Sequence, residues 1–237
     1  MAEKINEIRR GESGYGLIID NDGYISADIG DNKRLFEASE PSKGGQDGFL
    51  CPYPFIVSAV MQKYGIENAN GRIYPETVLK KQAELYMEKI NEKRAIGECN
   101  HPSESVIDLS RVAINVIEMH WEGHTLVGKL EILTSPGFRR YGNITCQGDQ
   151  VANLLLHGIK IGVSSRGLGT VVNKMGTMYV SDDYEIVCWD VVSDPSTPNA
   201  WIVPDGEIPS TYVESKENKD KEKLIEGLEK FNEWLND

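Results

Sequence analysis

Three segments of the chain each carry one residue that could form part of a nucleophilic catalytic site. His101 follows the short apolar stretch 95–99 and precedes Pro102, so we expect its ring near the end of a strand. An imidazole titrates close to neutral pH, which suits it to act as a general base. A histidine at such a position is nevertheless more often structural than catalytic, and His101 by itself identifies no site.

Ser164 follows the apolar segment 159–163 and precedes a second serine and two nearby glycines. We expect this serine to close a strand, with its hydroxyl exposed and neighbouring backbone N–H groups free to bind an oxyanion. The alternative is a β-bulge or turn in which Ser164 and Ser165 satisfy backbone groups, and on this segment alone the alternative is favoured. The spacing differs from the GxSxG elbow of α/β-hydrolases.

Asp190 is a carboxylate within the apolar stretch 187–192. Burial of an unpaired carboxylate is costly, so Asp190 faces either solvent or a specific partner such as a histidine. These two interpretations carry equal weight, and Asp194 and Glu98 are possible substitutes for it.

A zinc site is the competing use of the histidines. His120 and His124 could combine with Cys99 and His101, but they lie on either side of the predicted turn 121–124 rather than on one helix face. No HExxH pattern is present. We therefore expect no metal and no cofactor.

The elements around these residues predict an α+β fold that is mainly β. The segments 112–120 and 125–133 have the pattern of an antiparallel hairpin. A helical period begins near Pro75 and continues to about Arg94. We expect a largely antiparallel sheet or barrel surrounded by helices. Further strands are predicted at 54–61, 95–99, 159–163 and 184–192, and a short helix at 150–157.

The length of 237 residues and the 40% of hydrophobic residues fit one globular domain with extensions. Residues 1–50 are predicted to be an N-terminal extension, flexible in part, with a possible short strand near 15–20. Residues 51–206 form the predicted domain. Residues 207–237 are predicted to be an acidic linker followed by a C-terminal amphipathic helix.

The formal net charge of −12 disfavours binding to free nucleic acid. No segment has the roughly 18 consecutive apolar residues of a membrane span, so we expect no membrane association. The four cysteines are widely scattered, without a CxxC pair, which is typical of idle thiols in a reducing compartment.

Taken together, several segments resemble the prohead core protein proteases of myovirus-type tailed phages. The resemblance covers about residues 54–203, in order and with compatible spacing. It is carried by NANGRIYP at 68–75, AIGECNHP at 95–102, GVSSRGLG at 162–169, WD at 189–190 and DPSTPNAW at 194–201.

This resemblance implies a serine endopeptidase with the fold of the herpesvirus assembly proteases, a largely antiparallel β-barrel surrounded by helices. It implies Ser164 as nucleophile, His101 as general base and Asp190 as the acid that orients the histidine. In the herpesvirus enzymes a second histidine occupies the third position, and an arginine pair stabilises the oxyanion. No arginine follows Arg166 here, so we assign the oxyanion hole to backbone N–H groups around Arg166 and Gly167.

The resemblance also implies cleavage of scaffold, core and major capsid proteins after Leu/Ile-x-Glu motifs, inside the assembling prohead in the host cytoplasm. Two such motifs end at Glu37 and Glu226, which we predict to be self-cleavage sites. Arg166 or Arg111 could bind the substrate glutamate. We expect a homo-oligomer of unknown order. The alternatives are a catalytically inactive structural or scaffold protein with the same fold, and an esterase that uses the same serine and histidine.

Overall fold

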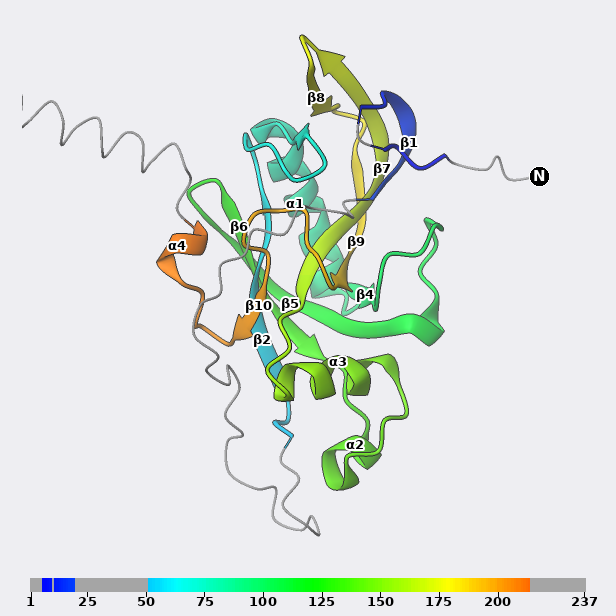
Figure 1. The fold of residues 1–237 in the computed structure, drawn as a ribbon, viewed down its shortest axis with the longest axis vertical. Helices are drawn as coiled ribbons and strands as arrows, with labels where there is room; N and C mark the ends of the chain where they lie inside the picture. Colours follow the sequence, from blue (N-terminus) through cyan, green and yellow to red (C-terminus); the bar gives the residue numbers. More distant parts are fainter. Residues whose placement is uncertain (1–5, 10, 20–50, 214–237) are drawn as a thin grey trace, which may run out of the picture.

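The computed structural model describes residues 6–9, 11–19 and 51–213, and these residues form a strand-rich α+β fold (Figure 1). The first of its two five-stranded sheets has the order β1-β7-β8-β3, with β9 also paired to β7. All of its pairs are antiparallel except β3 with β8. Its strands are β1 (Gly14–Ile19), β3 (Arg72–Ile73), β7 (Gly162–Lys174), β8 (Thr177–Val180) and β9 (Glu185–Val192).

The second sheet has the order β10-β2-β6-β5-β4 and is antiparallel throughout. The predicted hairpin is confirmed as β5 and β6, which pair from Ile114 opposite Ile132 to Glu122 opposite Thr125. The strands are β2 (Phe55–Lys63), β4 (Ile96–Glu98), β5 (Val112–Glu122), β6 (Thr125–Ile132) and β10 (Ile202–Pro204).

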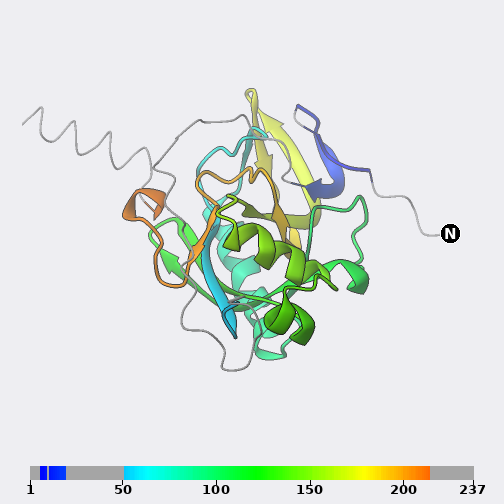
Figure 2. The ribbon, with the colours of Figure 1, turned by 60° about the horizontal axis from the view of Figure 1, so that its bottom comes forward.

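Two longer helices cover the sheets, and each of these helices buries one apolar face against the strands. The predicted helix from Pro75 is confirmed as α1 (Glu76–Asn91), whose buried positions recur at helical spacing and pack against β5 and β9. Helix α3 (Gln147–Leu156) packs on β5 and β6. It lies beside the short helix α2 (Pro136–Tyr141) at the lower end of the molecule (Figures 1 and 2).

Single bridges join the two sheets at two places. Cys99, just after β4, pairs in parallel with Val191 of β9. Gly162 of β7 pairs with Trp201, just before β10. The described strands are thus divided between two linked sheets, and the single closed barrel expected from the sequence is not present as one continuous ladder within the described ranges.

Residues on both sides of the predicted 51–206 domain belong to the body. Strand β1 pairs with β7 along its whole length, and the buried Arg72 donates to the backbone carbonyl of Ile19 at 2.8 Å. At the other end, Thr125 donates to the carbonyl of Val213 in helix α4 (Ser210–Val213) at 3.0 Å. Residues 14–19, which the sequence analysis assigned to the extension, are therefore part of the first sheet. The predicted C-terminal helix lies outside the described residues.

One hydrophobic core runs between the sheets and under α1. Trp189 is at its centre: the indole packs edge-on against Tyr86 of α1, with ring centroids 4.7 Å apart. The indole N–H donates to the carbonyl of Met61 in β2 at 3.2 Å. This residue therefore ties β9 to the helix and to the second sheet. Among the described helices, none combines the length and the apolar character that crossing a membrane requires.

Candidate active site

The pairing of β7 with β9 places Ser164 directly opposite Asp190. Residues directly opposed in an antiparallel pair carry their side chains on the same face of the sheet. Ser165 is opposite Trp189, so it belongs to the face that packs under α1. Of the two adjacent serines, Ser164 is the one that shares a face with Asp190.

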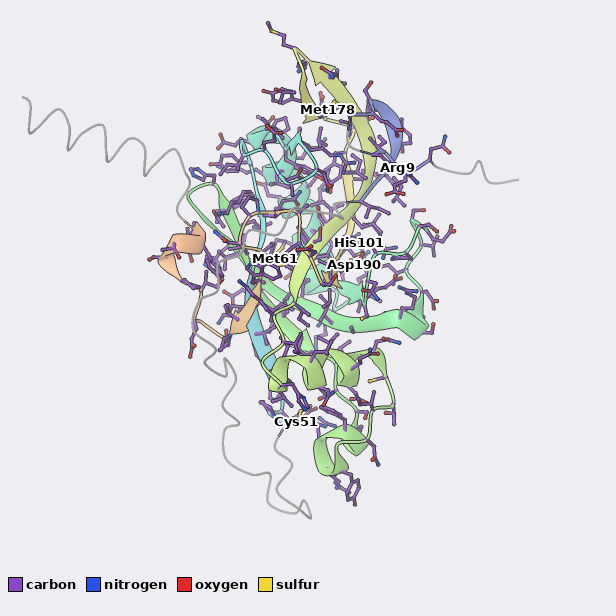
Figure 3. All side chains as sticks on the ribbon, in the orientation of Figure 1. Arg9, Cys51, Met61, His101, Met178 and Asp190 are labelled. Carbon is purple, nitrogen blue, oxygen red and sulfur yellow. The ribbon has the colours of Figure 1, made fainter. Side chains whose placement is uncertain are left out.

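His101 reaches the same place from the end of β4. Beyond the strand, the backbone N–H of Asn100 donates to the carbonyl of Val191 at 2.8 Å. Asn100 has a φ of 66°, in the left-handed region that asparagine tolerates better than most residues. The chain then turns, and Nδ1 of His101 lies 2.7 Å from Oδ2 of Asp190, at the centre of the molecule (Figure 3).

The imidazole of His101 is fully enclosed, and its Nδ1 is hydrogen-bonded to Asp190. Because Nδ1 donates to Asp190, Nε2 of the neutral ring is an acceptor. Nε2 is buried and has no hydrogen-bond partner in the part of the chain that the structure describes. A buried nitrogen without a hydrogen bond costs free energy, and among the buried side-chain atoms of the described residues that share this state, Nε2 is the one on a ring held by a carboxylate. Nε2 is placed to receive a proton.

Asp190 is a fully buried carboxylate with donors on both oxygens. Oδ2 also accepts from Nε of Arg166 at 2.9 Å, and Oδ1 accepts from the backbone N–H of Glu98 at 2.9 Å. Burial raises the pKa of Asp190, but the hydrogen bond and charge of His101 and the charge of Arg166 outweigh burial and lower the pKa below its ordinary value. Asp190 therefore stays ionised and can stabilise an imidazolium.

Arg166 is fully buried and its guanidinium is shared among several acceptors. Besides Asp190, it forms an ion pair with Glu98 at 3.3 Å and donates to the carbonyl of Glu104 at 2.6 Å. A substrate carboxylate could bind Arg166 only by displacing one of these groups. Arg111, the other cation considered for that role, is partly exposed and donates to the carbonyl of Cys99 at 2.9 Å.

The expectation that a strand ends at Ser164 with its hydroxyl exposed is wrong, because Ser164 is fully buried near the start of β7. β7 continues to Lys174, and Arg166 and Gly167 lie inside it, with β1 on one side and β9 on the other. A Cβ at Gly167 would collide with the ring of Tyr184, so this glycine is required by close packing rather than by a turn. The assignment of Arg166 and Gly167 as oxyanion donors stays a prediction, without the support of free N–H groups after a strand end.

The other histidines and acids considered from the sequence form no hydrogen bond or ion pair with His101 in the described part of the chain. Asp190, rather than Asp194 or Glu98, makes the contact with His101. His120 is half-exposed on β5, with Nε2 3.0 Å from a carboxylate oxygen of Glu122. Within residues 6–9, 11–19 and 51–213, no three His, Cys, Asp or Glu side chains are close enough to hold a metal ion.

The ion pair of Glu98 with Arg166 was not predicted from the sequence, where Glu98 was named only as a possible substitute for Asp190. Both ionisable side chains lie in apolar surroundings, Glu98 three residues before His101 and Arg166 two residues after Ser164. That signal was available, because buried charges are normally paired. The sequence does not identify which charges pair, because Glu98 and Arg166 belong to strands of different sheets.

A strand-rich α+β fold with a buried aspartate–histidine pair beside a serine is consistent with the serine protease class. Residues 17–212 match the family model of the prohead core protein serine proteases. The chain therefore belongs to this family, which confirms the resemblance drawn from the sequence, and it is a protease.

Two relatives define the similarity more closely. The prohead core protein protease of Enterobacteria phage T4 is 33% identical over 166 residues, which are 69% of this chain and 74% of that protein. The solved structure of the bacteriophage T4 capsid assembly protease, gp21, superposes with a TM-score of 0.53 at 26% identity. The match covers 58% of this chain and 80% of that one.

Proposed function

We propose that the protein is a serine endopeptidase with Ser164 as nucleophile, His101 as general base and Asp190 as the orienting acid. The observation that carries the proposal is the state of the imidazole. Its Nδ1 is 2.7 Å from Asp190, and its Nε2 is buried without a hydrogen bond among the described residues. The register of β7 and β9 supports Ser164 as the third member.

In the proposed reaction, Oγ of Ser164 attacks the carbonyl carbon of the peptide bond while its proton passes to Nε2 of His101. That proton then moves to the leaving amine as the C–N bond breaks, and an ester remains on Ser164. A water molecule gives a proton to Nε2 and attacks the ester. Release of the acid product and return of the proton regenerate the serine. Asp190 holds Nδ1–H throughout and stabilises each imidazolium.

The proposed substrates are the scaffold, core and major capsid proteins of a phage prohead, cleaved after Leu/Ile-x-Glu inside the assembling particle. Family membership and the name of the T4 relative support this role. We also propose self-cleavage after Glu37 and Glu226. Both residues lie outside the part of the chain that the structure describes, so their motifs in the sequence are the support.

We further propose that the two sheets act as one barrel-like unit of the herpesvirus assembly protease kind. The support is the pair of inter-sheet bridges, Cys99 with Val191 and Gly162 with Trp201, which connect the sheets at two places. An experimental structure in which either pair is separated would contradict this proposal.

The test of the proposed function compares Ser164→Ala with Ser165→Ala, since the two serines are adjacent but lie on opposite faces of β7. Cleavage of a Leu-x-Glu peptide should fall by a factor on the order of 10⁶ in Ser164→Ala. Ser165→Ala should keep most of its activity and its labelling by a serine-directed fluorophosphonate. Activity that survives in Ser164→Ala would contradict the assignment.

The same variants test self-cleavage. Intact-mass measurement of the incubated wild-type chain should show ends trimmed at Glu37 and Glu226. Ser164→Ala should keep its full mass, and Glu37→Gln or Glu226→Gln should block trimming at the substituted end only. Trimming of Ser164→Ala by the same preparation would point to another protease.

A further inference from the structure

A buried cluster of charges lies behind the proposed triad. Asp190, Arg166 and Glu98 each have no exposed surface, and they come from β9, β7 and β4. Arg166 bridges the two acids: Nε is 2.9 Å from Oδ2 of Asp190, and Nη2 is 3.3 Å from Oε2 of Glu98. These three side chains are two acids and one guanidinium.

The carboxylate of Asp190 has hydrogen-bond partners on both oxygens. Oδ2 of Asp190 is shared by His101 and Arg166, while Oδ1 is held by the backbone N–H of Glu98 and the thiol of Cys188. With both oxygens held, the carboxylate cannot rotate away from the imidazole. A buried ion cluster is poor evidence of stabilisation, because apolar residues of similar volume often do as well.

The same two residues hold the segment that follows His101. Nη1 of Arg166 donates to the carbonyl of Glu104, and Oε1 of Glu98 accepts from the backbone N–H of Asp108. Arg166 and Glu98 therefore contact both the carboxylate partner of His101 and the backbone that carries His101.

We propose that Arg166 and Glu98 are positioning residues that together fix the orientation and the effective charge of Asp190, and thereby how tightly His101 holds its catalytic proton. The inference rests on the proposed triad and goes beyond it. In this arrangement the positive charge of Arg166 partly neutralises the carboxylate of Asp190, and the carboxylate of Glu98 partly neutralises Arg166.

Other charged or titratable groups around Asp190 come from each neighbouring element. Cys188 lies on the same strand and Cys99 follows β4, and burial raises the pKa of both thiols. Burial likewise raises the pKa of Tyr86 on α1 well above its ordinary value. These three groups are neutral near pH 7, so Arg166 is the charge that acts on Asp190 besides His101, and the charge of Glu98 acts on Arg166. The guanidinium of Arg111 lies 3.8 Å from Oε2 of Glu98, the same oxygen that Nη2 of Arg166 approaches, so Glu98 has a second cation beside it.

The test measures the acidic limb of the pH profile of kcat/KM on the full chain. Arg166→Met leaves Asp190 unopposed, so the limb should move to higher pH by about one unit. Glu98→Gln removes the second carboxylate that faces Arg166, so the positive charge of Arg166 acts more strongly on Asp190 and the acidic limb should move to lower pH. The double variant keeps the net charge of the cluster and should return towards the wild-type limb. Arg166→Lys keeps the charge and should keep the limb, with lower kcat because a single ammonium cannot make the same set of contacts.

Opposite shifts in the two single variants, with compensation in the double variant, support the inference, because a merely structural role does not move the limb in opposite directions. Limbs that stay in place, or that move together, overturn it. If Arg166→Met does not fold, the test rests on Glu98→Gln and the double variant: a shift of the acidic limb to lower pH in the first and its return in the second support the inference. An active Ser164→Ala would refute the triad itself, whereas unmoved limbs with an inactive Ser164→Ala would refute only the positioning role.

Discussion

Two buried aspartates in this protein solve the same physical problem in different ways. Asp149, in the first turn of α3, and Asp190, in β9, both have no exposed surface. Asp149 is held entirely by neutral donors, the backbone and hydroxyl groups of Ser135 and Thr145 and the backbone N–H of Cys146, at 2.6–3.2 Å. Asp190 instead has an imidazole and a guanidinium.

The difference separates a structural carboxylate from the proposed catalytic one. The hydrogen bonds to Asp149 join the N-termini of α2 and α3, and nothing in that set can gain or lose a proton near neutral pH. The partners of Asp190 include one group that can. Burial and a lowered pKa are common to both acids, so neither feature alone identifies the functional site.

The largest effect should separate the two acids by activity. Asp190→Asn should lower kcat by about 10⁴-fold, because the amide no longer holds the histidine in the tautomer that frees Nε2 as an acceptor. Asp149→Asn should retain most of the wild-type kcat at a temperature where it is folded. Steady-state cleavage of the same peptide by both variants gives the comparison. Equal losses would mean that the two acids have similar roles.

For the free energy of unfolding, we expect the substitution at Asp149 to matter more than it does for activity. Asp149→Asn loses several charge-assisted hydrogen bonds and should destabilise the protein by about 3 kcal/mol in urea unfolding. Asp183 is a matched control, since it also accepts from a backbone N–H and a hydroxyl, both of Thr170, but is exposed. Asp183→Asn should cost about 1 kcal/mol or less. A loss for Asp149→Asn no larger than that of Asp183→Asn would refute its structural role.

The stabilising role of Asp149 should also depend on pH. Although burial opposes it, hydrogen bonding lowers the pKa of Asp149 to about 2. The unfolded chain binds the proton near pH 3.9, so between about pH 4 and pH 2 the unfolded state holds more protons and stability falls as the pH falls. Urea midpoints across this interval should fall less steeply in Asp149→Asn than in the wild type. Parallel curves would show that Asp149 does not titrate differently in the two states.

The smallest effect concerns the backbone that presents His101. Asn100 has a positive φ, so Asn100→Ala should cost about 1 kcal/mol of stability and reduce kcat, whereas Asn100→Gly should be close to neutral. Thermal unfolding and peptide cleavage measure the two effects. An alanine variant as stable as the glycine variant would show that the conformation at Asn100 is not under strain.

Local sequence patterns predicted the regular elements that their own residues determine. The apolar run of β2, the start of α1 at Pro75 and the β5–β6 hairpin are set by short-range periodicity and turn chemistry, and all three were predicted. His101 and Asp190 were also predicted to interact, through the family resemblance and the cost of an unpaired buried acid.

Long-range packing explains what the sequence did not predict. A strand end was predicted at Ser164, but β7 continues through Gly167 and Gly169, where the absence of a side chain leaves room for Tyr184. The place of β1 beside β7 and the ion pair of Glu98 with Arg166 join distant parts of the chain. No local pattern in either segment specifies such a partner.

The order of the strands along the chain has a consequence for when the protein can become active. β1 near the N-terminus pairs with β7, and the carboxylate on β9 is synthesised after both His101 and Ser164. Contacts between residues so far apart form slowly, because the chain must close long loops first. A nascent chain that has not yet formed β9 therefore carries the proposed nucleophile and base without the acid that orients them, and the proposed triad is complete only when most of the body is folded.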